Sequence, residues 1–311
     1  NRSRVDYPNG AYTAYTYDAL NRLTAIEHGK GVTVLARYTY TLDPVGNRIG
    51  VTQLDGTSIQ YEYDFLRRLT REVHRNAANL VMRAFTYTYD AVGHRLTKTD
   101  LSGTLTNYVY DQDDRLRSAG DITFNYDANG NLISRLQGGQ TTTYQYDYEN
   151  RLIAINHPVS GNTTYFYNAN GIRTRKQDST GVVCYLIDPS NNTGYAQVLE
   201  EYDPVSRETS VYYTYGDDLL SQNRDGVVRF YHYDGCNSTR LLTDVAGSIT
   251  DTYLFDAFGL LLESFGTTKN DYLFTGEQYD PNSGFYYLRA RYYSPQTGRF
   301  ITRDTIRGNN Q

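Results

Sequence analysis

Aromatic and polar residues alternate along most of this chain, in a phrase that recurs about every twenty residues. Residues 15–26 read YTYDALNRLTAI, and near copies are YTYDAVGHRLTKT at 87–99, FNYDANGNLISR at 124–135 and YQYDYENRLIAI at 144–155. Alternation with a period of two is typical of β-strands, whereas a helix repeats about every 3.6 residues. The pattern therefore predicts strands, and the regular spacing predicts an array of similar units.

Each repeat unit is predicted to fold as a β-hairpin. In the first unit Tyr15 and Tyr17 precede the segment DALN, and Leu23 and Ile26 follow it. The phrase aromatic-x-aromatic-Asp, or a near copy, begins at Tyr15, Tyr38, Tyr61, Tyr87, Tyr108, Phe124, Tyr144, Tyr165, Tyr185, Tyr213, Tyr231 and Tyr253. We therefore expect an all-β chain built from tandem hairpins.

A turn signal lies between the two strands of each unit. The Asp side chain can accept bonds from backbone N–H groups at the start of a turn, and the Gly or Asn three residues later tolerates a positive φ. This predicts turn-forming roles for Asp18, Asn21, Asp90, Gly93, Asp127, Gly130, Asp256 and Gly259. Asn191 is expected to act in the same way in a later repeat. Arg67, Asp114 and Ser206 break the pattern and predict longer or strained loops.

The 33 tyrosines are predicted to form the core of the array. In a ribbon of hairpins, equivalent tyrosines are expected to lie on one face and to stack as cross-strand neighbours, with each hydroxyl bonded to water or to a backbone carbonyl. Burial of one large side chain stabilises a fold by about 1.5–3 kcal/mol, so such a ladder can replace an aliphatic core.

The repeated phrase and the C-terminal segment resemble the Rhs/YD-repeat family of bacterial polymorphic toxins, toxin-complex C components and animal teneurins. The more specific segment is residues 272–304, YLFTGEQYDPNSGFYYLRARYYSPQTGRFITRD, which is similar to the Rhs-associated core of that family. The resemblance implies a spiralling sheet that forms a segment of a hollow shell. It divides the chain into a YD-repeat array at 1–271, an Rhs-associated core at 272–306 and a tail at 307–311.

The resemblance also implies a function. In this family the shell encapsulates a C-terminal toxic domain of the same parent chain, which is released inside by self-cleavage and then delivered. The expected partners are that cargo domain, together with secretion machinery or a glycan or protein of a cell surface. The expected location is secreted or on the cell surface.

Self-cleavage in the family uses a site like that of aspartyl proteases. The matching residues are Arg291 in RARYY, as an orienting group, and Asp304 in GRFITRD, as one of two carboxylates that share a proton. Such chemistry needs two carboxylates whose pKa values are driven apart. The second one is expected downstream of Gln311, and Thr305 replaces the usual Pro. This chain is therefore not expected to be an enzyme by itself.

Composition argues against several other functions. The formal charge is -5, so no nucleic-acid partner is expected, and no apolar run is long enough for a membrane span. The five histidines are scattered, which predicts no metal site, and no cofactor motif is present. Cys184 and Cys236 leave one disulfide or none open.

Three hypotheses from different classes remain. The first is the encapsulating scaffold, the second is an adhesive module that binds carbohydrate or protein through exposed tyrosines, and the third is the aspartyl autoprotease of the parent chain. Because the chain begins in mid-repeat, it is expected to be part of a longer polypeptide, and open sheet edges make self-association possible. Tyr alternates with Thr, Ala or Gln, which favours one apolar face and therefore the scaffold.

Overall fold

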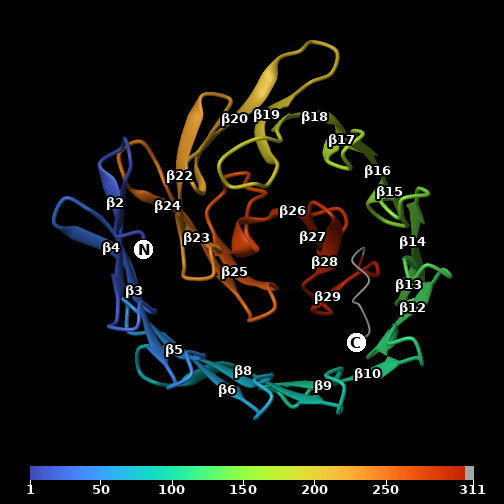
Figure 1. The fold of residues 1–311 in the computed structure, drawn as a ribbon, viewed down its shortest axis with the longest axis horizontal. Helices are drawn as coiled ribbons and strands as arrows, with labels where there is room; N and C mark the ends of the chain where they lie inside the picture. The colour runs from blue at the N-terminus through green and yellow to red at the C-terminus, as the bar shows by residue number, and fades with distance from the viewer. Residues whose placement is uncertain (305–311) are drawn as a thin grey trace. The chain divides into compact units, whose positions relative to one another are not determined.

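The structure, a computed structural model, describes residues 1–304 and consists of β-strands joined by turns (Figure 1). The predicted all-β class with tandem hairpins is confirmed. The chain divides into two compact units. Unit 1 comprises residues 1–120, 232–257 and 261–267, and unit 2 comprises residues 121–231, 258–260 and those from 268 onward.

Unit 1 contains the N-terminal hairpins and three later strands. Its strands are β1 (Arg4–Asp6), β2 (Ala11–Tyr17), β3 (Leu23–Lys30), β4 (Thr33–Leu42), β5 (Arg48–Gln53), β6 (Ser58–Tyr63), β7 (Leu69–Arg75), β8 (Val81–Tyr89), β9 (Arg95–Asp100), β10 (Leu105–Tyr110), β11 (Leu116–Ala119), β23 (Thr239–Thr243), β24 (Ile249–Phe255) and β25 (Leu261–Phe265). Successive strands from β1 to β11 pair antiparallel, as do β23 to β25.

Unit 2 contains the later hairpins and a separate four-stranded sheet. Its hairpin strands are β12 (Ile122–Tyr126), β13 (Leu132–Gln137), β14 (Gln140–Tyr146), β15 (Leu152–His157), β16 (Gly161–Tyr167), β17 (Arg173–Asp178), β18 (Gly181–Asp188), β19 (Gln197–Tyr202), β20 (Thr209–Tyr215), β21 (Leu219–Arg224) and β22 (Val227–Tyr233), the last of which ends in unit 1. A short 3-10 turn, η1 (Phe274–Gly276), precedes the second sheet. That sheet consists of β26 (Gln278–Asp280), β27 (Phe285–Leu288), β28 (Arg291–Ser294) and β29 (Arg299–Phe300).

The hairpins share one irregularity, which lies immediately before the turn. In the first hairpin Tyr15 lies opposite Ile26, and the register shifts between Thr16 and Tyr17. The same shift occurs between the two residues before the turn Asp in the hairpins at 81–100, 122–137 and 140–157. Such a β-bulge is the usual companion of a short loop that ends in a left-handed residue. The repeated phrase therefore specifies both the loop and the register that follows it.

The core of unit 1 mixes tyrosine with aliphatic side chains. One buried cluster contains Ile26, Tyr38, Tyr40, Val51 and Ile59. In the register, Tyr38 lies opposite Ile26 on one side, and Tyr40 lies opposite Val51 on the other. The expected stacking of equivalent tyrosines as cross-strand neighbours is therefore wrong. Equivalent strands are separated by the returning strand of each hairpin, so its Ile or Val lies between them.

In several repeats the second tyrosine of the phrase connects one hairpin to the hairpin before it. In unit 1 the hydroxyl of Tyr63 donates to the backbone carbonyl of Arg48 at 2.8 Å, and that of Tyr89 donates to Leu69 at 2.7 Å. In unit 2 Tyr146 donates to Leu132 at 2.9 Å. Each ring is half-buried while its polar end is satisfied, which is the arrangement that tyrosine favours.

The predicted domain boundaries are not tested by this fold. The sheet β26–β29 lies within 272–306, and the predicted array at 1–271 contributes to both units. The predicted tail at 307–311 lies outside the described residues.

Candidate functional site

The predicted turn residues lie at the ends of the hairpins. The carboxylate oxygen Oδ1 of Asp18 accepts the backbone N–H groups of Leu20 at 2.9 Å and Arg22 at 3.0 Å, and Asn21 has a φ of 59°. Hydrogen bonds from the backbone and side chain of Arg22 hold the pKa of Asp18 below its usual range. Asp90 accepts the N–H of His94 at 2.8 Å, and Gly93 has a φ of 100°.

The other two predicted turns add contacts beyond the loop itself. In unit 2 Asp127 accepts the N–H of Asn131 at 2.8 Å, and Gly130 has a φ of 86°. Gly259 has a φ of 87°, and a Cβ atom there would lie 2.4 Å from a ring carbon of Phe274. In unit 1 Asp256 is buried, with Oδ2 at 3.3 Å from Nζ of Lys98.

The loops expected to differ do so in two ways. Arg67 and Asp114 have φ values of 62° and 61°, so these non-glycine residues adopt the left-handed conformation in loops of ordinary length. After Asp203 the loop is one residue longer, and Arg207 rather than Ser206 has the positive φ. The expectation for Asn191 is wrong, because Gly194 has the positive φ. The side-chain amide of Asn191 instead donates to the carbonyl of Tyr195 at 2.7 Å.

In two hairpins of unit 1 an arginine forms a clasp between one turn and the corresponding turn of the next repeat along the chain. In unit 1 Nε of Arg22 contacts Oδ2 of Asp18 at 2.7 Å, and its Nη1 donates to the carbonyl of Asp43 at 3.0 Å. Arg68 repeats the arrangement, with Asp64 at 2.7 Å and the carbonyl of Asp90 at 2.5 Å. At these two positions the Arg four residues after the turn Asp therefore joins neighbouring repeats.

The structure brings the two predicted catalytic residues together. In unit 2 Nη2 of Arg291 lies 2.9 Å from Oδ2 of Asp304, and the guanidinium also lies 3.7 Å from the ring centroid of Phe300. Asp304 is half exposed, with 50% of its side-chain surface accessible. The pair supplies one carboxylate and a cation, whereas acid–base cleavage needs two carboxylates. Thr305 lies outside the described residues.

The C-terminal sheet packs on the hairpins of unit 2 through a buried arginine that was not predicted. Arg173 on β17 donates through Nη1 to the hydroxyl of Tyr292 at 3.1 Å and through Nη2 to Oε1 of Gln278 at 2.5 Å. Its backbone N–H donates to the hydroxyl of Tyr287 at 2.9 Å, and its guanidinium lies 4.2 Å from the centroid of that ring. The forked guanidinium thus bonds to two strands of the C-terminal sheet, β26 and β28, at once.

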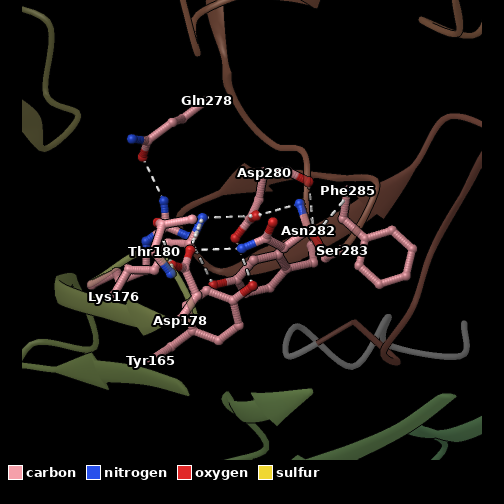
Figure 2. A network of polar contacts seen from close by, with 11 residues as sticks. Tyr165, Lys176, Asp178, Thr180, Gln278, Asp280, Asn282, Ser283 and Phe285 are labelled. Carbon is pink, nitrogen blue, oxygen red and sulfur yellow. Dashed lines mark hydrogen bonds and ion pairs between the residues drawn. The ribbon is translucent and has the colours of Figure 1, made fainter. Parts of the chain in front are cut away.

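Beside Arg173 lies a network of charged groups that Figure 2 shows. Nζ of Lys176 lies 3.0 Å from Oδ1 of Asp280 and 3.2 Å from Oδ2 of Asp178. Tyr165 donates to Oδ2 of Asp280 at 2.6 Å, and Asn282 donates to Oδ2 of Asp178 at 2.6 Å. One lysine therefore lies between two carboxylates.

Asp178 in this network is held in its charged form. Burial opposes ionisation, but hydrogen bonds from the hydroxyl and backbone N–H of Thr180, together with the charge of Lys176, lower the pKa of Asp178. Burial raises the pKa of Tyr165, so this phenol remains a donor.

A further acidic group of unit 2 has a shifted pKa. Burial raises the pKa of Asp271 to about 6, and the charge of Glu201 adds to this effect. Glu201 accepts the hydroxyl of Tyr213 at 2.7 Å and lies 3.4 Å from Nη1 of Arg224. Asp271 itself lies just before η1, and no pattern in the sequence singles these groups out.

Unit 1 contains two buried histidines in contact. The ring centroids of His28 and His232 are 5.1 Å apart, and neither side chain is exposed to solvent. Nε2 of His28 donates to the carbonyl of Tyr233 at 3.0 Å, and its Nδ1 lies 2.9 Å from the hydroxyl of Thr13. Burial lowers the pKa of His28 to about 4 and lowers that of His232 in the same direction. Both imidazoles are therefore neutral at neutral pH.

Other chemistry finds little support in the described residues. Within 1–304, no group of three or more His, Cys, Asp or Glu side chains could bind a metal ion. Cys184 in unit 2 and Cys236 in unit 1 are both free cysteines in this structure. In that same range, no helix is long and apolar enough to cross a membrane.

Comparison with known families decides the classification of the chain. A family described as Teneurin YD-shell matches residues 47–310. The chain belongs to the Rhs/YD-repeat family. A second family description, RHS Repeat, matches residues 1–33 of this YD-repeat chain.

Two curated relatives are similar to parts of the YD-repeat chain. It is 33% identical over 203 residues to the tRNA3(Ser)-specific nuclease WapA of Bacillus spizizenii, an alignment that covers 63% of this chain and 8% of the relative. It is 26% identical over 226 residues to the double-stranded DNA deaminase toxin A of Burkholderia cenocepacia, covering 60% of this chain and 15% of the relative. The chain thus spans a small part of either relative.

A solved structure shares the fold of the YD-repeat chain. The crystal structure of TcdB2-TccC3-Cdc42 matches with a TM-score of 0.79 at 18% identity. The match covers 99% of this chain and 18% of that chain.

Proposed function

We propose that this chain is the C-terminal part of a hollow YD-repeat shell that encapsulates a toxic domain of the same parent chain and helps to deliver it. The observation that carries the proposal is similarity to two proteins that are named for unrelated chemistries. One relative is named as a tRNA nuclease and the other as a DNA deaminase. Their alignments cover 63% and 60% of this chain, so they overlap. A shared repeat array supplies a common carrier, while the catalytic domain differs.

The exposure of the tyrosines supports the scaffold over an adhesive surface. A binding wall built from tyrosine needs many exposed rings, but of the 33 tyrosines the exposed ones are Tyr148, Tyr195 and Tyr212. In β14 the buried Tyr144 alternates with exposed Thr143 and Gln145. One face of β14 therefore packs in the core, and the other presents polar side chains, as the wall of an aqueous container requires.

Under this proposal the parent protein is secreted or displayed at the cell surface. The toxic cargo is its first partner, and secretion machinery or a glycan or protein of the target cell is a further one. These assignments come from the family and from its relatives, one of which is named as a toxin.

The proposal is tested on the full parent protein, purified without denaturant from its source. Intact mass and terminal sequencing should reveal a C-terminal fragment that begins downstream of Gln311 and remains bound after cleavage. The bound fragment should resist added protease until the shell is unfolded. A parent chain that ends near Gln311 and retains no fragment would refute encapsulation and favour an adhesive or self-associating module.

Self-cleavage of the parent chain is a second candidate activity, favoured by the 2.9 Å contact between Arg291 and Asp304. Asp304→Asn in the full parent protein is expected to leave the cargo covalently attached, because the amide cannot share the proton. Glu149→Gln, which changes an exposed carboxylate on a hairpin loop of the same unit, is the matched control. Cleavage of the Asp304→Asn protein at the wild-type rate would exclude Asp304 from the reaction.

A further inference from the structure

The charged network around Lys176 contains the groups that are needed to condense an amine with a carboxyl group. A primary amine lies within hydrogen-bond distance of one carboxylate, with a second carboxylate on its other side. Lys176 and Asp178 are two residues apart on β17, so their side chains leave the same face, and Asp280 ends β26. The contact between Lys176 and Asp280 joins residues that are 104 apart in the chain.

The site is shielded from water. The side chains of Asp280, Asp178 and Lys176 retain 2%, 8% and 16% of their accessible surface. The ring of Phe285 is buried at the start of β27, and its centroid lies 5.9 Å from that of Tyr144. Burial of three charges is expensive unless they are neutralised. An amide between Lys176 and Asp280 would remove two of them.

We propose that Lys176 and Asp280 form an intramolecular isopeptide bond, with Asp178 as the proton acceptor. The chemical outcome is an amide between Nζ of Lys176 and Cγ of Asp280, with release of one water molecule. The proposal does not depend on encapsulation of a cargo.

The reaction balances without an added reagent. Asp178 takes a proton from the ammonium group, and the neutral amine attacks Cγ of Asp280, whose Oδ2 is polarised by the hydroxyl of Tyr165 at 2.6 Å. The C–N bond forms, and one C–O bond of the carboxyl group breaks. Two protons from nitrogen leave with that oxygen as water, one of them through Asp178, which is restored. Nζ of Lys176 lies 3.0 Å from Oδ1 of Asp280, so the amine is held beside the carboxyl group that it would attack, and such proximity accelerates intramolecular reactions.

The bond would fasten the C-terminal core to the hairpins of unit 2. It would connect β17 to the end of β26, close to the contacts that Arg173 makes with Tyr292 and Gln278. Since both cysteines are free, this link would be a covalent clamp that needs no oxidant. It would also keep the C-terminal sheet attached to β17 when the hydrogen bonds between them break.

Intact mass under denaturing conditions tests the proposal directly. The wild-type protein is expected to weigh about 18 Da less than its sequence mass, since one water is lost. A protease digest should contain one branched peptide that joins the residues around Lys176 to those around Asp280. A wild-type mass equal to the sequence mass would overturn the proposal. A deficit of about 17 Da, the loss of ammonia, would assign the link to Asn282 and would overturn the assignment to Asp280.

Matched variants separate the covalent bond from the ion pair. Lys176→Arg keeps the positive charge but cannot form the amide, so its mass should equal its own sequence mass. Asp178→Asn should slow the appearance of the mass deficit at least tenfold after synthesis, because the proton acceptor is lost. Lys269→Arg is the control and should retain the full deficit. A deficit that persists in Lys176→Arg would also overturn the proposal.

Discussion

Acid should destabilise unit 1 through its buried histidines. Burial lowers the pKa of His28 to about 4, whereas in the unfolded chain it has the ordinary value of 6.5. The unfolded state therefore binds the proton more readily between these two values. The contribution of neutral His28 is complete above pH 6.5 and is lost as the pH falls toward 4. A difference of about 2.5 units, at about 1.4 kcal/mol per unit, corresponds to about 3.5 kcal/mol, of which about 3 kcal/mol is lost by about pH 4.

The assay is denaturant unfolding of wild type and His28→Gln from about pH 7.5 to about pH 4, followed by tyrosine fluorescence. Glutamine can still donate to the carbonyl of Tyr233 and accept from the hydroxyl of Thr13, but it does not titrate. The wild-type free energy of unfolding should fall by about 3 kcal/mol more than that of the variant over this range. His157→Gln, in unit 2, is the control. Parallel pH profiles for wild type and His28→Gln would refute the reasoning.

Two further substitutions test the hairpin turns and the contact between Arg173 and the C-terminal sheet. Gly130→Val should lower the free energy of unfolding by more than about 1 kcal/mol, because Gly130 has a φ of 86° and valine is strained there. Gly130→Asn should cost less, and coincident unfolding midpoints for Gly130→Val and wild type would contradict the hairpin geometry. Arg173→Met should destabilise unit 2 by about 2–3 kcal/mol, since two buried charge-assisted bonds are lost. Arg173→Lys should not restore these two bonds. Hydrogen exchange should show faster opening of β28 in both variants. Unchanged exchange would show that Arg173 does not hold the C-terminal sheet in place.

The local structure could be predicted from the sequence because it depends on neighbours in the chain. Asp18 and Asn21 lie in one loop, and the alternation around Tyr15 and Tyr17 specifies a strand. Tyrosine packing was predicted less well, because the phrase does not show that Ile26 and Val51 return between successive tyrosines. At Asn191, the nearby Gly194 adopts the left-handed conformation instead.

The contacts of the core could not be predicted in the same way. Arg173 meets Tyr292 across 119 residues, and nothing in the repeat period indicates on which hairpin the C-terminal sheet packs. The sequence did contain one usable signal. Lys176 and Asp178 are two residues apart, so their charged side chains lie on the same face of a strand, and that face is largely buried. Such a face requires polar partners from elsewhere. Arg291 and Asp304 were paired from the family resemblance, and their catalytic roles stay a prediction.

The clasp between a turn and its successor bears on how such chains evolve. Arg22 reaches from its own Asp18 to the carbonyl of Asp43, and Arg68 reaches from Asp64 to the carbonyl of Asp90, so these two junctions use one arginine and a backbone acceptor. Because every residue carries a backbone carbonyl, a duplicated hairpin that keeps its arginine can form the same junction with whichever hairpin follows it. The array can therefore gain such a hairpin without a matching side chain in its new neighbour.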